Sequence, residues 1–167
     1  MKVDLKKSDD AYRARRGEFR VLEVPNTRYL AVAGSGDPNT APAYRAALEA
    51  LYPFAYALKF AARDALGRDH VVPPWIPSDV IDVAREKAGD RSRGVELRTL
   101  MEGTCVQTLH VGSFDDEGPV IEAMHSHALA DGYRLTGTHH EIYLSDPRRT
   151  APERLRTILR QPVAVAL

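Results

Sequence analysis

The chain has 167 residues with 23 Lys plus Arg, 23 Asp plus Glu and one Cys, so its formal net charge is zero. A neutral chain lacks the cationic excess that binding to nucleic-acid phosphates requires, and the lone Cys105 cannot form an intrachain disulfide. No apolar run reaches the roughly 18 residues of a membrane span, and the amino terminus has no signal-peptide pattern. These features predict one cytoplasmic domain over residues 1–167 that binds neither nucleic acid nor membrane.

The first half of the chain predicts strands followed by helices. Residues 1–17 interleave basic and acidic side chains, which predicts a charged, solvated N-terminal arm. Two extended runs follow at 19–24 and 29–33, and a helical pattern then covers 43–66. Pro53 interrupts that pattern, so we expect a kink or a new helix start there. Val71-Val72 predicts a short strand, and Ser78 is the expected N-cap of a helix over 79–88.

The second half repeats this order of elements. Residues 95–101 and 104–111 predict a hairpin, Pro119 begins a helix that runs to about Asp131, and strands are expected at 138–144 and 157–163. A Gly-Ser-x-Asp loop stands between strand and helix in both halves, at 34–37 and 112–115. The repetition suggests duplication of one α+β unit.

The densest polar cluster is the run 138–144. Alternate side chains of a strand share a face, so His139, Glu141 and Tyr143 are expected together, opposite the apolar Ile142. An acid between an imidazole and a phenol is typical of ligand pockets. Glu141 could then serve as a general acid or base, or pair with a ligand cation; the alternative is an ordinary half-exposed surface strand.

Two other chemistries are weighed against this cluster. The histidines are metal-ligand types, but His125 and His127 diverge on a helix and no Cys or His motif has zinc spacing, so we expect no metal. Cys105 lies on a predicted strand without a flanking base, which favours a small core residue over a nucleophile.

Aromatic residues form a second candidate surface. Tyr52, Tyr56 and Phe60 recur every four residues and predict one stripe along the first helix. Such stripes usually belong to the core, but the neighbouring face already carries leucines, so this stripe is also a candidate cavity wall. Tyr133, just past the second main helix, is a further candidate for such a wall.

Four segments, covering nearly the whole chain, together resemble the stand-alone GyrI-like small-molecule-binding proteins. The segments are 29–39, 55–60, 102–112 and 139–149, the last continuing through 152–163. The resemblance implies an α+β fold: a duplicated βαββ unit forming one curved antiparallel sheet, with two main helices, a central ligand cleft and no cofactor. Related domains are effector-binding halves of multidrug-responsive transcription regulators, and some stand-alone members hydrolyse the cyclopropane of DNA-alkylating natural products.

The resemblance also implies site residues. Glu141 matches the acid that lies in the cleft of such proteins, Tyr143 belongs to the same motif, and Tyr56 falls in the helix segment. The predicted catalytic pair is Glu141 and Tyr143. The predicted ligand-binding set is Glu141, Tyr143, Tyr56, Phe60, His139, Tyr133 and Trp75.

The chain departs from the family pattern at one place. Relatives continue after the segment that matches 71–74 with an acid-Gly-Leu-Trp-Trp segment, whereas this chain passes directly to Trp75-Ile76-Pro77. A hairpin is therefore absent, and three explanations stay open: the cleft is more open, a partner chain completes it, or the natural chain contains a stretch that this sequence lacks. An unpaired edge at 71–72 would favour pairing with another chain, such as a second copy in a homodimer.

Three functions follow. The leading hypothesis is binding of hydrophobic, aromatic and often cationic small molecules beside Glu141. The first alternative is hydrolysis of strained, cyclopropane-bearing electrophiles in the same cleft, and the second is a regulatory module that contacts a protein partner through the open edge. Direct transcriptional control is not expected, because residues 1–17 are too short for a helix-turn-helix unit.

Overall fold

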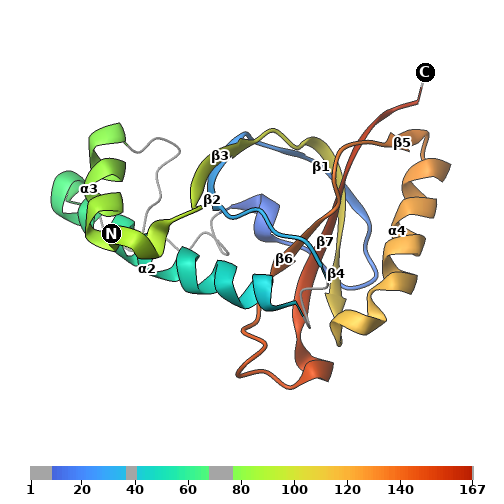
Figure 1. Cartoon of the computed structure of the whole chain (residues 1–167). Coiled ribbons are helices and arrows are strands. Elements are labelled where there is room, and N and C mark those ends of the chain that lie inside the picture. Colours follow the sequence, from blue (N-terminus) through green and yellow to red (C-terminus); the bar gives the residue numbers. More distant parts are fainter. Residues whose placement is uncertain (1–8, 37–40, 68–76, 167) are drawn as a thin grey trace. The chain divides into compact units, whose positions relative to one another are not determined.

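The computed structural model describes residues 9–36, 41–67 and 77–166, and the chain divides into two compact units (Figure 1). The helical unit is built mainly from Thr27–Leu100, and the sheet unit combines Leu5–Asn26 with Met101–Leu167. The predicted strand at 71–72 and the ligand candidate Trp75 lie outside the described residues.

In the helical unit, two helices pack on each other beside a two-stranded sheet. Strand β2 (Thr27–Ala31) pairs antiparallel with β3 (Glu96–Leu100), and the helices are α2 (Pro42–Leu66) and α3 (Ser78–Ala88). Their shared core consists of Phe54, Leu58, Ala61 and Ala62 from α2, Val80, Ile81, Ala84 and Ala88 from α3, and Val95. Burial of these apolar side chains stabilises both helices.

Helix α2 is continuous through Pro53, so the predicted alternative of a new helix start there is wrong. A proline inside a helix removes one backbone hydrogen bond. The residues on either side of that defect belong to one buried face, with Phe54 and Leu58 packed in the core, and this packing offsets the loss. The helix ends at Gly67, whose positive φ of 62° suits a residue without a Cβ.

Helix α3 begins one residue earlier than the predicted cap implies. Pro77 occupies the N-cap position and Ser78 is the first helical residue, so Ser78 is not the N-cap. A proline fixes its own backbone angle and lacks an N–H, which makes it compatible with a helix start.

The sheet unit contains five antiparallel strands and one α-helix among its described residues. The strands are β1 (Arg20–Val24), β4 (Gly103–Val111), β5 (Tyr133–Leu135), β6 (His140–Tyr143) and β7 (Arg156–Val165), in the order β1-β4-β7-β5, with β6 also paired to β7. Helix α4 (Gly118–Ala130) packs on one face of this sheet. Its core consists of Val106, Met124, Ala128, Leu159 and Val163.

The predicted hairpin between 95–101 and 104–111 is wrong. Strand β3 pairs with β2 in the helical unit, and β4 pairs with β1 and β7 in the sheet unit. Most residues of β4 are buried. Such a strand needs a neighbour on each side to satisfy its backbone groups, and a two-stranded hairpin cannot provide both.

The fold class is confirmed as α+β with antiparallel sheets, as expected for a GyrI-like fold. The described residues contain three α-helices, α2, α3 and α4, each in a segment where a helix was predicted. One detail differs from the expected architecture: the described strands form two separate sheets where one curved sheet was expected.

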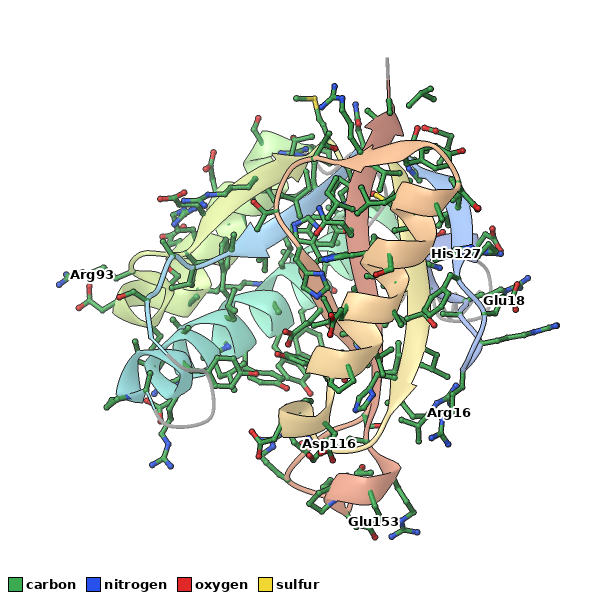
Figure 2. All side chains as sticks on the ribbon, turned by 90° about the vertical axis from the view of Figure 1, so that its right-hand side faces the viewer. Arg16, Glu18, Arg93, Asp116, His127 and Glu153 are labelled. Atoms are coloured by element: carbon green, nitrogen blue, oxygen red, sulfur yellow. The ribbon has the colours of Figure 1, made fainter. Side chains whose placement is uncertain are left out.

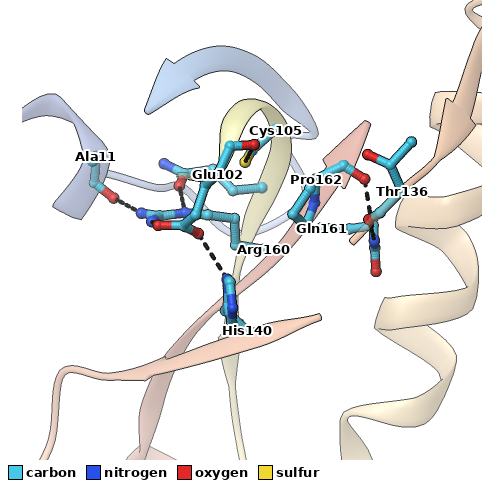
Figure 3. A network of polar contacts seen from close by, with 9 residues as sticks. Ala11, Glu102, Cys105, Thr136, His140, Arg160, Gln161 and Pro162 are labelled. Carbon is cyan, nitrogen blue, oxygen red and sulfur yellow. Dashed lines mark hydrogen bonds and ion pairs between the residues drawn. The ribbon is translucent and has the colours of Figure 1, made fainter. Parts of the chain in front are cut away.

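A buried polar network fixes the sheet face opposite α4 (Figure 3). Arg160 on β7 lies directly between His140 on β6 and Gln107 on β4. Its guanidinium donates hydrogen bonds to Gln107 Oε1 at 3.0 Å, to Glu102 Oε2 at 3.1 Å and to the carbonyl of Ala11. Glu102 Oε1 lies 2.8 Å from His140 Nδ1, and only 2% of the Arg160 side chain and 5% of that of Glu102 are exposed. The network therefore joins three strands to the segment around residue 11.

Replacement of Arg160 by Met should destabilise the protein by about 3–5 kcal/mol, because it leaves the carboxylate of Glu102 buried without its main partner. The free energy of unfolding, measured by urea denaturation, checks this. The matched control is Arg148→Met, which breaks an exposed ion pair with Asp146 and should change stability little. The double variant Arg160→Met with Glu102→Gln should recover part of the loss. If Arg160→Met lowered the free energy of unfolding no more than Arg148→Met does, the buried network would not stabilise the sheet as described.

Candidate functional site

Glu141 and Tyr143 lie side by side on β6. The Tyr143 hydroxyl donates a hydrogen bond of 2.6 Å to Glu141 Oε2, which confirms that these two side chains share a face. In the sheet, Glu141 stands opposite Leu159 and Tyr143 opposite Thr157. Leu159 packs in the core beneath α4, so the pair lies on the α4 side of the sheet. Glu141 is exposed and Tyr143 half-buried.

The turn before α4 adds an aromatic ring to this pair. Figure 2 shows α4 in front of the sheet, with Asp116 in the turn that precedes the helix and His127 nearer to its end. Phe114, in the same turn, packs against Tyr143 with ring centroids 5.0 Å apart and planes tilted by 52°. Sequence reasoning missed Phe114, although it noted the Gly-Ser-x-Asp loop that contains it.

Glu117, at the N-cap position of α4, is a second acid near Glu141 that sequence reasoning also missed. Only 4% of Glu117 is exposed to solvent, and its Oε1 atom is buried without a hydrogen-bond partner. Burial raises the pKa of Glu117, and the charge of Glu141 raises it further; the Thr157 hydroxyl and His110 act in the opposite direction. These causes favour the neutral, protonated acid at Glu117.

His139 lies immediately before β6, and both of its ring nitrogens are buried without a hydrogen-bond partner. Burial lowers the pKa of His139, and the charge of Glu141 offsets only part of that effect. The ring of His125 on α4 meets it edge-on with centroids 6.3 Å apart, and His125 Nε2 also has no partner. A neutral imidazole with free nitrogens can donate a hydrogen bond to an incoming group through one nitrogen and accept a hydrogen bond from it through the other.

The other predicted ligand residues lie elsewhere. Tyr133 stands on β5 opposite Val165 and packs against the core beneath α4. Tyr56 and Phe60 belong to the helical unit. With Tyr52 they form the predicted aromatic stripe, and its residues are 57%, 42% and 48% exposed respectively, so the stripe lies on the surface of α2 and not in the core.

Cations accompany this stripe. The Arg63 guanidinium lies 5.1 Å and the Lys59 ammonium 5.7 Å from the centre of the Phe60 ring. These contacts are within the range of cation–π attraction. In the protein without ligand, the Phe60 ring therefore already attracts the positive charges of Lys59 and Arg63.

Cys105 is a core residue, as predicted. Its side chain is fully buried with Ala11, Val24 and Leu22. Burial, followed by the negative charge of Glu102, raises the pKa of the Cys105 thiol to about 12. Because the thiolate is the nucleophilic form, Cys105 cannot serve as a nucleophile near neutral pH.

In the part of the chain that the structure describes, no three His, Cys, Asp or Glu side chains converge as metal ligands would. Within the same residues, no helix combines the length and the apolar character needed to cross a bilayer.

Residues 69–164 match the family model of the GyrI-like small molecule binding domain. The chain belongs to this family. The crystal structure of an uncharacterized conserved protein from Listeria innocua is similar to this chain, with 31% sequence identity and a TM-score of 0.87, over 98% of this chain and 100% of that one. Comparison with curated proteins gives no match.

Two further solved structures from Listeria innocua are described as hydrolases. They share 30% and 29% identity with this GyrI-like chain, with TM-scores of 0.80 and 0.82. Each comparison covers 98% of this chain and 100% of the other protein. The likeness therefore extends beyond the segment that the family model matches.

The thiol of Cys105 should resist alkylation by iodoacetamide at about pH 8, because a pKa about four units higher leaves roughly one thiol in 10⁴ ionised. Mass spectrometry of the labelled protein checks this, with complete labelling expected after unfolding in guanidinium chloride. Ser126→Cys, at an exposed position of α4, supplies a reactive control thiol in the same protein. Equal labelling rates for Cys105 and the control would show that the folded chain opens around Cys105.

Proposed function

We propose that this small-molecule-binding domain takes up hydrophobic aromatic ligands, often cationic, and that Glu141 receives their charged or hydrogen-bonding group. The observation that carries the proposal is the 2.6 Å hydrogen bond that orients an exposed Glu141 beside Tyr143. A ligand can reach this acid without displacing a salt bridge, since no described Lys or Arg side chain forms an ion pair with it.

The surroundings of Glu141 suit an aromatic cation. Tyr143 and Phe114 present two rings beside the acid, and an aromatic ligand gains from stacking on such rings as well as from cation–π attraction. The free nitrogens of His139 add a donor or acceptor for polar groups of the ligand. Charge, stacking and hydrogen bonding are thus available in one unit of the chain.

We propose that Tyr56 and Phe60 offer ligands an aromatic surface within the helical unit. Tyr56 and Phe60 support this because they are exposed on α2, where large aromatic side chains are rarely left without a function when they are grouped. Tyr133 is proposed for the ligand site of the sheet unit, and Trp75, which lies outside the described residues, stays a prediction. Tyr133 would act as part of the wall behind the site, because it already packs against the core beneath α4.

Replacement of Glu141 by Gln should weaken binding of cationic aromatic dyes by about 1–3 kcal/mol and leave neutral dyes of similar shape nearly unaffected, because only the cations lose a charged partner. Fluorescence titration of both variants with matched dyes checks this. Glu122→Gln, an exposed acid on α4, controls for the change in net charge. Equal losses for cationic and neutral dyes would argue against Glu141 as a charge-reading residue.

A second candidate is hydrolysis of strained electrophiles. It is favoured by two relatives of about the same length that are described as hydrolases. In this role Glu141 takes a proton from water, the water oxygen bonds to a cyclopropane carbon, and the broken carbon–carbon bond delivers its electrons to a conjugated carbonyl. Tyr143 would then turn its hydroxyl from Glu141 to the oxyanion that develops on that carbonyl.

If the chain is a hydrolase, turnover of a carbonyl-conjugated cyclopropane should be lost in Glu141→Gln and reduced in Tyr143→Phe, while both variants still bind the compound. Product analysis by mass spectrometry measures the ring-opened adduct, which gains the mass of one water molecule. Glu122→Gln should keep the turnover of the wild type. Undiminished turnover in Glu141→Gln would reject this mechanism and leave the binding role to stand alone.

A further inference from the structure

Glu117 and Glu141 are two carboxyl groups of the sheet unit, and the charge of Glu141 acts on Glu117. The row His110, Thr157 and Tyr143 crosses strands β4, β7 and β6, and residues directly opposite in antiparallel strands point to the same face. Phe114, three residues before Glu117, packs on Tyr143 at the end of this row. The start of α4 therefore places Glu117 over the row that leads to Glu141.

The two acids differ in environment. Glu141 is exposed and accepts the Tyr143 hydrogen bond, whereas Glu117 is 4% exposed and its Oε1 atom has no partner. Within the described part of the chain, no Lys or Arg forms an ion pair with either acid. A buried carboxyl group with one oxygen atom unpartnered is costly in its ionised form, and an added cation nearby would remove much of that cost.

We propose that a cation bound beside Glu141 expels a proton from Glu117, so that uptake of cationic ligands is coupled to proton release. The inference rests on the proposed function, because it requires that cations bind at Glu141. At a pH below the raised pKa of Glu117, the free site holds a proton on this carboxyl group. In the bound site the Glu117 O–H bond breaks, its electron pair stays on the carboxylate, and the proton passes to solvent.

The direction of the pH dependence follows from the groups that face Glu117. Burial disfavours the ionisation of Glu117 most, and Glu141 on β6 disfavours it further, whereas Thr157 on β7 and His110 on β4 favour it; the net effect is a raised pKa. A ligand cation counters the charge of Glu141 and so lowers the pKa of Glu117. Affinity for cations therefore rises with pH until Glu117 is ionised in the free protein, and is constant above that pH. A neutral ligand has no such dependence.

His139 is the other titratable group that could exchange a proton on binding. It feels the charges of Glu141, His125 and His140, and its pKa is already lowered by burial. A nearby cation would lower it further, which also releases protons. The experiment must therefore separate Glu117 from His139. Tyr143, and the exposed Asp115 and Asp116 in the turn before α4, complete the ionisable groups beside Glu117.

The test is calorimetric titration with N-methylacridinium, a permanent aromatic cation, and with N-methylacridone, an uncharged molecule of similar shape. Titrations in two buffers with different ionisation enthalpies give the number of protons released per ligand, at several values between about pH 4.5 and 8. The proteins are wild type, Glu117→Gln, His139→Gln and, as the matched control, Glu122→Gln on the exposed side of α4. Gln mimics the shape of the protonated acid, so Glu117→Gln should fold.

For wild type, we expect the cation to release up to about one proton and the neutral compound none. Glu117→Gln should lose this release and its pH dependence while still binding the cation, and Glu122→Gln should keep the release. The difference in proton release between wild type and His139→Gln measures the contribution of His139. Release that persists in Glu117→Gln, or cation binding without release in wild type, would overturn the inference while the proposed function stands. No saturable cation binding by wild type would overturn both.

Carbon-13 NMR gives a second measurement on the unmodified protein. With labelled glutamate, a carboxyl signal assigned to Glu117 should move toward its ionised position when N-methylacridinium is added at a pH where the free protein keeps it protonated. N-methylacridone should leave the signal in place. An unmoved signal in the presence of saturating cation would contradict the proposal whatever the behaviour of the Glu117 variant.

Discussion

The pairing register of β7 is the constraint on which the sheet unit depends. Its residues alternate between two faces, so Thr157 and Leu159 point to α4 whereas Ile158 and Arg160 point away. Strands β4 and β6 pair with it in a single register. A slip of one residue would exchange the faces, placing Arg160 in the apolar core and Leu159 among charged groups.

This register places adjacent residues of β6 on opposite faces of the sheet, where they have different roles. His140 stands opposite Arg160 and joins the network with Glu102, whereas Glu141 stands opposite Leu159 and emerges on the other side. A structural ion cluster and a candidate ligand site are thus built from neighbouring positions that face opposite sides of the sheet. The buried cluster fixes the strand, and the fixed strand holds Glu141 and Tyr143 at hydrogen-bond distance.

Local patterns predicted some of this arrangement. The alternation of side chains placed Glu141 with Tyr143, and helical spacing gave the stripe of Tyr52, Tyr56 and Phe60 on α2. Glu117 was missed because it follows two other acids, Asp115 and Asp116, and nothing local distinguishes the one that the sheet buries. The prediction of a hairpin was wrong for a related reason. It assumed that strands adjacent in sequence pair with each other, whereas β4 pairs with β1 and β7, which are far from it along the chain.

The hydrogen bond from Arg160 to the carbonyl of Ala11 spans 149 residues of sequence. Contacts of such separation close a very long loop, so they form late and slow the search for the native state. During synthesis, β1 and β4 leave the ribosome well before β7, and until β7 arrives β4 has one unpaired edge. The nascent sheet unit is therefore exposed to aggregation in that interval, and its solubility in cells depends on how quickly the final pairing follows translation.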